Sequence, residues 1–150
     1  MATSSAVKYA LKNGVAVLQI TSPPVNALGA AVRAGLVAGV EHAIGASATG
    51  LVVAGGGSTF PAGADITEFS KPHVPPSFAE VMAAFEDAPF PTAAAIHGTA
   101  LGGGFELAQA NVAFMLDQQH THEPDTPLLG LRRAQLAERA LRMYRQAAAQ

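Results

Sequence analysis

Two glycine-rich segments carry residue types that can move a proton and stabilise an oxyanion. The first is Phe60–Ile66, and the second is Gly98–Leu107. In the second segment Glu106 stands three residues after Gly103, so a helix that begins at the glycines would place both on one side of its first turn. The first N–H groups of such a helix lack internal partners and carry the positive end of its dipole. A backbone donor beside a carboxylate suits an oxygen that gains negative charge while a neighbouring carbon exchanges a proton.

A structural interpretation of the second segment stays open beside this functional one. Three glycines before a helix often serve only the tight packing of a strand against a helix. A glutamate near a helix start often only complements the helix dipole. Phosphate binding is a weaker hypothesis, because the Gly-x-Gly-x-x-Gly and Walker spacings are absent.

The elements that must position these segments are short apolar strands. The runs at 50–54 and 92–96 are wholly apolar after their first residue, which predicts strands buried on both faces. Each glycine-rich segment follows one of these runs. Because open α/β sheets bind ligands past the carboxyl ends of parallel strands, we expect both segments at one such edge.

A hairpin and two helices complete the predicted core. Val7–Leu11 and Val15–Ile20 are expected to pair across the Asn13-Gly14 turn. A helix is expected at 29–44 and another at 78–85. The apolar stripe of the first helix consists of Val32, Leu36, Val40 and Ile44, and that of the second of Phe78, Met82 and Phe85. This alternation predicts an α/β fold with at least one parallel pair of strands.

The last third of the chain follows a different pattern. All arginines but one lie beyond residue 130. We therefore expect a core at 1–110 and a divergent tail at 111–150. The tail is predicted to hold a polar loop at 118–130 and an amphipathic, Arg-rich helix at 131–148.

Composition excludes several classes of protein. The 150 residues are 49% hydrophobic and 13% charged, which is ample for a core, and the net charge of −2 makes nucleic acid a poor partner. The absence of cysteine excludes disulfide scaffolds, thiol nucleophiles and zinc–thiolate sites. No run is apolar enough for a membrane span, and Met1–Ser5 show no start of a signal peptide. A soluble cytoplasmic protein is expected.

One cluster in the tail has metal-ligand types at close spacing. It consists of His120, His122, Glu123 and Asp125. Two histidines two residues apart could share one face of a strand and hold a metal ion. In a polar loop such residues are more often solvated, so we expect no metal.

Taken together, the segments resemble the crotonase (enoyl-CoA hydratase/isomerase) family. The likeness is greatest to the N-terminal hydratase/isomerase domain of multifunctional fatty-acid β-oxidation enzymes. It covers about residues 7–108. The matching stretches, in order, are Val15–Ile20, Pro23–Leu28, Ala62–Ile66 with Glu68-Phe69, and Ala95–Leu107. The resemblance implies a crotonase-like β-β-α spiral core, incomplete at its C-terminal end.

The resemblance also implies roles for individual residues. The backbone N–H groups of Ala62 and Gly103 would form an oxyanion hole for the thioester carbonyl of an acyl-CoA, and Glu106 would be one of two catalytic carboxylates. The positions that correspond to the neighbourhood of CoA are Val25, Ala27, Ala64, Asp65 and Ile66. CoA enters with the substrate, so no further cofactor is implied.

The second catalytic carboxylate is where this chain departs from the family pattern. The family has a Pro-Glu dipeptide before a Leu-Gly, and the nearest counterpart here is Pro124-Asp125 before Leu129-Gly130. Asp125 is therefore the candidate for the second carboxylate. A truncated or frame-altered product, a natural short paralogue and a fragment all stay open as accounts of the divergent C-terminal part.

The predicted function is that of an enoyl-CoA hydratase or isomerase in fatty-acid β-oxidation, acting on acyl-CoA thioesters. The alternative is a non-catalytic protein that binds acyl-CoA, or a protein partner through 131–148. A second carboxylate near Glu106 would discriminate the two. A homo-oligomer stays open, while nucleic acid and a membrane span are not expected.

Overall fold

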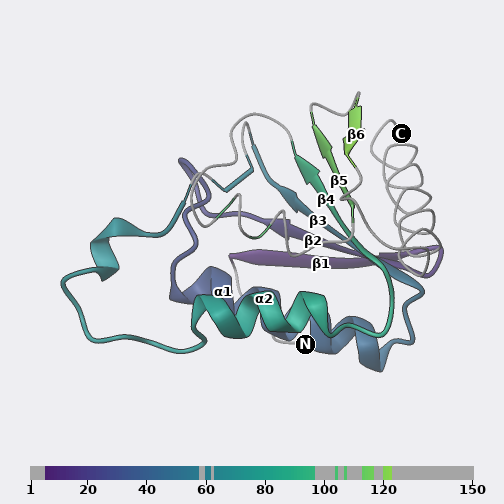
Figure 1. Ribbon diagram of the computed structural model, residues 1–150, viewed down its shortest axis with the longest axis horizontal. Helices are drawn as coiled ribbons and strands as arrows, with labels where there is room; N and C mark the ends of the chain where they lie inside the picture. Colours follow the sequence, from purple (N-terminus) through teal and green to yellow (C-terminus); the bar gives the residue numbers. More distant parts are fainter. Residues whose placement is uncertain are drawn as a thin grey trace.

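The computed structural model describes residues 6–57, 60–61, 63–96, 104, 107, 113–116 and 120–122. Within these ranges a mixed six-stranded sheet has the order β1-β2-β3-β4-β5-β6, and two helices cover one of its faces (Figure 1). The strands are β1 (Val7–Lys12), β2 (Val15–Ile20), β3 (Gly50–Gly55), β4 (Thr92–Ile96), β5 (Ala113–Leu116) and β6 (His120–His122). The helices are α1 (Ala30–Gly45), α2 (Phe78–Glu86) and the short 3-10 helix η1 (Ile66–Glu68). The predicted α/β class is confirmed.

The first two strands form the predicted hairpin. They pair antiparallel, with Lys12 opposite Val15. Asn13 and Gly14 between them have φ angles of 51° and 81°. Two successive positive φ angles are those of a type I′ turn, whose twist matches the twist of the flanking strands.

The middle of the sheet is parallel, as the alternation of strands and helices predicted. β2, β3, β4 and β5 pair in parallel, and the last residues of β2 and β3, Ile20 and Gly55, are opposite one another. Every residue of β3 and β4 is buried. The loops that leave β2 and β3 therefore start at the same edge of the sheet.

Helix α1 begins and ends within one residue of its predicted bounds, but its buried apolar stripe differs from the predicted one at Ile44. Val32, Leu36 and Val40 are at most 2% exposed, whereas Ile44 is 46% exposed. At 3.6 residues per turn, each step of four residues rotates by about 40° beyond a full turn, so three steps carry Ile44 about 120° away from Val32. Ala43 is buried in its place.

Helix α2 is fixed at its start by a reciprocal cap. The Glu80 N–H donates to the Ser77 hydroxyl at 3.2 Å, and the Ser77 N–H donates to the Glu80 carboxylate at 2.5 Å. This pairing satisfies two backbone donors that the helix leaves free. Val81 and Phe85 face the core; Phe85 was predicted and Val81 was not.

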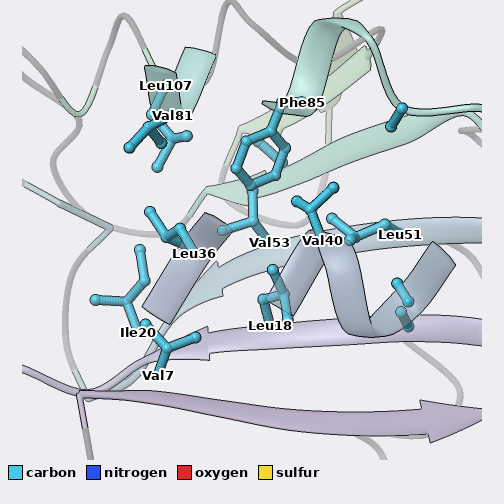
Figure 2. Close-up of a cluster of buried hydrophobic side chains, with 14 of the residues drawn as sticks. Val7, Leu18, Ile20, Leu36, Val40, Leu51, Val53, Val81, Phe85 and Leu107 are labelled. Carbon is cyan, nitrogen blue, oxygen red and sulfur yellow. The ribbon is translucent and has the colours of Figure 1, made fainter. Parts of the chain in front are cut away.

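The core lies between the sheet and the two helices. Figure 2 shows Leu18 and Val53 of the sheet facing Leu36 and Val40 of α1, with Phe85 of α2 beside them. The helix comes so close to the sheet that a Cβ on Gly39 would lie 2.5 Å from Leu18 Cδ2. The close approach explains a glycine inside a helix, where it otherwise costs about 1 kcal/mol relative to alanine.

The sheet continues past the boundary predicted at residue 110. β5 pairs in parallel with β4, and β6 pairs antiparallel with β5. The prediction of an unbroken loop at 118–130 is wrong at His120–His122, where backbone pairing with Leu116–Phe114 makes a strand. The predicted helix at 131–148 lies outside the described residues.

None of the helices in the described ranges is both long and apolar enough to cross a membrane.

Candidate functional site

Two loops that leave the carboxyl ends of β2 and β3 meet at one edge of the sheet. The Gly56 N–H donates to the Ile20 carbonyl oxygen at 2.7 Å, and the Leu28 N–H donates to the Gly63 carbonyl oxygen at 3.0 Å. The first loop carries Val25 and Ala27, and the second carries Ala64, Asp65 and Ile66. The five positions that the family resemblance associates with CoA therefore lie in these two joined loops.

Asn26 holds the first loop in shape, a role that sequence reasoning did not assign. Its side chain is 3% exposed, accepts from the Ser22 N–H at 2.9 Å and donates to the Gly56 carbonyl oxygen at 2.9 Å. Its φ is 54°, in the left-handed region that asparagine tolerates better than most residues. An asparagine two residues after the Pro23-Pro24 pair was the available signal for such a turn.

Asp65 shapes the second loop. It stands at the N-cap of η1, where its Oδ1 accepts from the Thr67 hydroxyl at 2.6 Å and from the Thr67 N–H at 3.0 Å. These hydrogen bonds hold the pKa of the Asp65 carboxyl below its ordinary value. The carboxylate is therefore ionised at neutral pH and is engaged by its own loop.

The side chains around these loops leave apolar surface open. Ile66 is 75% exposed and Phe69 is 76% exposed, in a segment that projects beyond the end of the sheet in Figure 1. Phe69 also lines a pocket of about 360 Å³. Its lining includes Arg33, Ala64, Asp65, Glu68, Phe69, Lys71, His73 and Phe78. The edge of the sheet therefore offers both apolar and charged contacts to a ligand.

The lining of the pocket includes an ion pair between a buried arginine and a partly exposed glutamate. Arg33 Nη1 lies 2.8 Å from Glu68 Oε2, and Arg33 is 4% exposed. Hydrogen bonds from the Arg33 side chain and then from the Ala30 N–H hold the pKa of Glu68 below its ordinary value. Sequence reasoning assigned neither residue a role. An arginine directly beside the apolar stripe of its helix was the signal that could have found it.

The two glycine-rich segments touch through Pro61 and Gly104. A Cβ on Gly104 would lie 1.8 Å from the Pro61 carbonyl oxygen and 2.6 Å from its carbonyl carbon. Only glycine fits so close to another backbone. Gly104 thus serves a close approach to the loop that contains Pro61, while the predicted packing of a strand against the helix stays a prediction. Gly104 and Leu107 are helical, which agrees with a helix that begins at the glycines.

Four predicted site residues lie outside the described part of the chain, namely Ala62, Gly103, Glu106 and Asp125. Ala62 directly follows Pro61, and Gly103 directly precedes Gly104. The observed contact is therefore one residue away from each predicted oxyanion-hole donor. The roles of all four stay predictions.

The histidine cluster of the tail is described only in part. His120 and His122 both belong to β6. Glu123 and Asp125 lie outside the described residues. Among the residues that the structure does describe, no group of three or more metal-ligand side chains gathers.

The sequence matches a family model described as enoyl-CoA hydratase/isomerase over residues 10–146. The chain belongs to this family. The match covers most of the chain and includes both glycine-rich segments and the tail beyond residue 110. The resemblance seen in the motifs is confirmed.

Relatives with this family's names are similar to parts of the chain. It is 43% identical over 99 residues to a peroxisomal bifunctional enzyme of Danio rerio. The match covers 65% of this chain and 14% of that protein. It is 39% identical over 114 residues to a probable enoyl-CoA hydratase of Bacillus subtilis (strain 168), which covers 71% of this chain and 44% of that protein. The chain therefore spans less than half the length of either relative.

Solved structures of family members share the fold. Enoyl-CoA hydratase subunit I of Geobacillus kaustophilus HTA426 has a TM-score of 0.68 at 31% identity, covering 77% of this chain and 47% of that one. DspI of Pseudomonas aeruginosa has a TM-score of 0.71 at 28% identity, covering 79% and 52%. The enoyl-CoA hydratase/isomerase chain thus has the crotonase-like core predicted for it, over about half of these structures.

Proposed function

We propose that this protein binds acyl-CoA thioesters and catalyses hydration or double-bond isomerisation of enoyl-CoA in fatty-acid β-oxidation. The backbone N–H groups of Ala62 and Gly103 receive the thioester oxygen, and Glu106 transfers the proton. Asp125 is the candidate for the second carboxylate. The proposal requires no metal or redox cofactor, and we place the reaction in the cytoplasm.

The chemistry follows from the acidity of carbon atoms beside a thioester. Addition of water across the 2,3 double bond, or migration of the bond, passes through an enolate whose negative charge lies on the thioester oxygen. Each preorganised N–H donor aimed at such an oxygen is worth about 3 kcal/mol in the transition state. A glutamate within hydrogen-bond reach then moves a proton between water and carbon, or between two carbons.

The observation that carries the proposal is the contact of Pro61 with Gly104. In the proposed oxyanion hole, the backbone N–H groups of Ala62 and Gly103 must face one oxygen atom. These two residues are about forty positions apart in the sequence. A Cβ added to Gly104 would lie 1.8 Å from the Pro61 carbonyl oxygen, so the two segments are in backbone contact at the chain neighbours of Ala62 and Gly103, which supports the proposal. The five positions associated with CoA lie in loops joined by the Leu28–Gly63 hydrogen bond, and their apolar surface suits a long thioester ligand.

The test is hydration of crotonyl-CoA, followed as loss of the absorbance of the conjugated thioester. We expect turnover by the wild type and a loss of about 10²-fold or more for Glu106→Gln. Glu86→Gln is the matched control, because Glu86 is an exposed residue at the end of α2. Equal turnover by Glu106→Gln and the wild type would remove Glu106 from the chemistry.

A second substrate separates hydration from isomerisation. A 3-enoyl-CoA can be converted to its 2-enoyl isomer by a single carboxylate, whereas hydration uses two. If Asp125→Asn loses hydration and keeps isomerisation, Asp125 is the second carboxylate of the hydratase. A folded wild type that binds crotonyl-CoA and turns over neither substrate would instead favour the non-catalytic alternative.

A further inference from the structure

The segment between Gly63 and Ser77 has little of its own to hold it in place. Its regular structure is the three-residue helix η1, and the apolar side chains of Ile66, Phe69 and Val74 are 75%, 76% and 53% exposed. Burial of these side chains therefore contributes little to fixing the segment. Contacts of another kind must hold it against the sheet and α1.

Arg33 supplies those contacts from the first turn of α1. Its Nε donates to the Pro76 carbonyl oxygen at 2.7 Å, and its Nη2 donates to the Val74 carbonyl oxygen at 2.9 Å. Its Nη1 donates to the Leu28 carbonyl oxygen at 2.9 Å and to Glu68 at 2.8 Å. One planar guanidinium thus ties Glu68 and the C-terminal end of the 63–77 segment to Leu28 of the first loop.

Glu68 completes the arrangement from the opposite side. Its Oε2 accepts from Arg33, and its Oε1 accepts from the Ala30 N–H at 2.7 Å. That N–H belongs to the start of α1, where backbone donors lack helix partners and negative charge is favoured. The Phe78 ring also lies 5.8 Å from the guanidinium carbon of Arg33. The pair therefore joins α1, η1 and the start of α2.

The pair is connected to the positions associated with CoA through one residue. Leu28 donates its N–H to Gly63 and accepts from Arg33 with its carbonyl oxygen. Glu68 stands two residues after Ile66 and three after Asp65. A change in the Arg33–Glu68 geometry would therefore shift Ala64–Ile66 relative to the first loop.

We propose that Arg33 and Glu68 are positioning residues that set the affinity of this site for the CoA part of an acyl-CoA, by fixing the spacing of the loops at 22–29 and 63–68. This inference rests on the proposed function. The pair touches no reacting atom in the proposed chemistry, so it acts on binding and leaves the chemical step unchanged.

Glu68→Gln tests the proposal with the least disturbance, since glutamine keeps the shape and an acceptor for the Ala30 N–H. The dissociation constant of crotonyl-CoA is measured by titration calorimetry, and KM and kcat are measured in the hydration assay. We expect the dissociation constant and KM to rise about tenfold, the effect of one charge-assisted hydrogen bond, while kcat stays within about twofold. Glu41→Gln, at an exposed glutamate of α1, is the matched control and should bind like the wild type.

Arg33→Lys gives a second readout that a general loss of stability would not produce. Lysine keeps the charge, but one ammonium cannot serve Glu68 and the carbonyl oxygens of Leu28, Val74 and Pro76 together. We expect binding as weak as in Glu68→Gln, with thermal unfolding still cooperative and kcat retained at saturating substrate.

The outcomes separate this inference from the function on which it rests. If the wild type binds crotonyl-CoA and Glu68→Gln binds it equally well, the positioning role is wrong and the proposed function stands. If Glu68→Gln lowers kcat and leaves KM unchanged, the pair acts on catalysis and the inference is also wrong. If the folded wild type binds no crotonyl-CoA, both proposals fail.

Discussion

The face of the sheet covered by the helices and the edge that carries the candidate site are held together by different forces. Between sheet and helices, side chains such as Leu18, Leu36 and Phe85 are at most 1% exposed, and they pack without polar partners. At the edge, loops are held by named hydrogen bonds, by the Arg33–Glu68 pair and by the backbone approach of Pro61 to Gly104. A buried core side chain packs against many neighbours, whereas a loop held by a few polar contacts depends on each of them.

The same difference decides which residues can be substituted without loss of the fold. The apolar face carries most of the free energy of folding, because each fully buried large side chain contributes about 1.5–3 kcal/mol. The edge holds the side chains left exposed for a ligand, including Ile66 and Phe69. Substitutions of the exposed side chains at the edge should therefore act on binding more than on stability, whereas loss of a buried hydrogen bond or a clash at a backbone contact should lower stability as well.

The largest expected effect is at such a backbone contact, in Gly104→Ala. The new Cβ would lie 1.8 Å from the Pro61 carbonyl oxygen, and neither backbone can move away without disturbing the buried Phe60 and Leu107 beside it. We expect a loss of more than about 3 kcal/mol in the free energy of unfolding, or failure to accumulate soluble protein, measured by urea denaturation and soluble yield.

Gly45→Ala is the control for that substitution. Gly45 is the last residue of α1, and nothing lies within 4 Å of the position of its Cβ. Alanine there should leave the free energy of unfolding unchanged or raise it by up to about 1 kcal/mol. If both alanine variants unfold at the same urea concentration, the backbone of Gly104 does not lie close enough to the Pro61 carbonyl oxygen to exclude a Cβ.

The next largest effect is expected when phenylalanine is replaced by alanine in the core, and the same substitution at the edge is its comparison. Phe85 is 1% exposed in the core, and Phe69 is 76% exposed at the edge. Phe85→Ala should lower the free energy of unfolding by about 3–5 kcal/mol, because it leaves a cavity that the neighbours cannot fill. Phe69→Ala should change it by no more than about 0.5 kcal/mol. Equal losses in chemical denaturation would show that the edge is packed as the core is.

The core and the edge also differ in how far the sequence could predict them. Val15–Ile20 and Thr92–Ile96 were predicted at their observed bounds, because runs of apolar residues record burial directly. The predicted buried stripe of α1 was wrong at Ile44, because a four-residue repeat drifts away from the 3.6-residue period of the helix. The strand at His120–His122 was missed because it is polar and three residues long, and its pairing with β5 depends on residues elsewhere in the chain.

At the edge, the sequence predicted that the two glycine-rich segments would lie together, but it did not predict that the loops after β2 and β3 would meet or what would hold them. The five positions associated with CoA do lie in two joined loops. The hydrogen bonds of Arg33 to carbonyl oxygens at Leu28, Val74 and Pro76 leave no trace in the sequence, because any residue supplies a carbonyl. Long-range polar contacts of this kind have no periodicity that could reveal them.

A smaller effect is expected at Asn26, where backbone strain and hydrogen bonding can be separated. Asn26→Ala loses the bonds to Ser22 and Gly56 and places alanine at a φ of 54°. It should cost about 2–4 kcal/mol of unfolding free energy. Asn26→Gly loses the bonds and relieves the strain, so it should cost about 1 kcal/mol less. If Asn26→Gly instead lowers the free energy of unfolding more than Asn26→Ala does, the positive φ at residue 26 does not strain alanine.

The smallest effect is a change in the pH dependence of stability in Glu68→Gln. The pKa of Glu68 is held below its ordinary value of 4.5 by Arg33 and by the Ala30 N–H, so the folded chain binds fewer protons there than the unfolded chain. This contribution to stability is present above about pH 4.5 and is lost as the pH falls through the lower pKa of the folded state.

Urea unfolding between pH 7 and 3 should therefore show the wild type losing more stability on acidification than Glu68→Gln, with Glu41→Gln following the wild type. The difference should be modest, because the Glu68 side chain is 30% exposed and water screens its charge. Asp65 and Glu80 also have lowered pKa values and act in all three proteins, so the difference between the curves isolates Glu68. Parallel curves would mean that the edge owes its order to hydrogen-bond geometry and not to the charge of the pair.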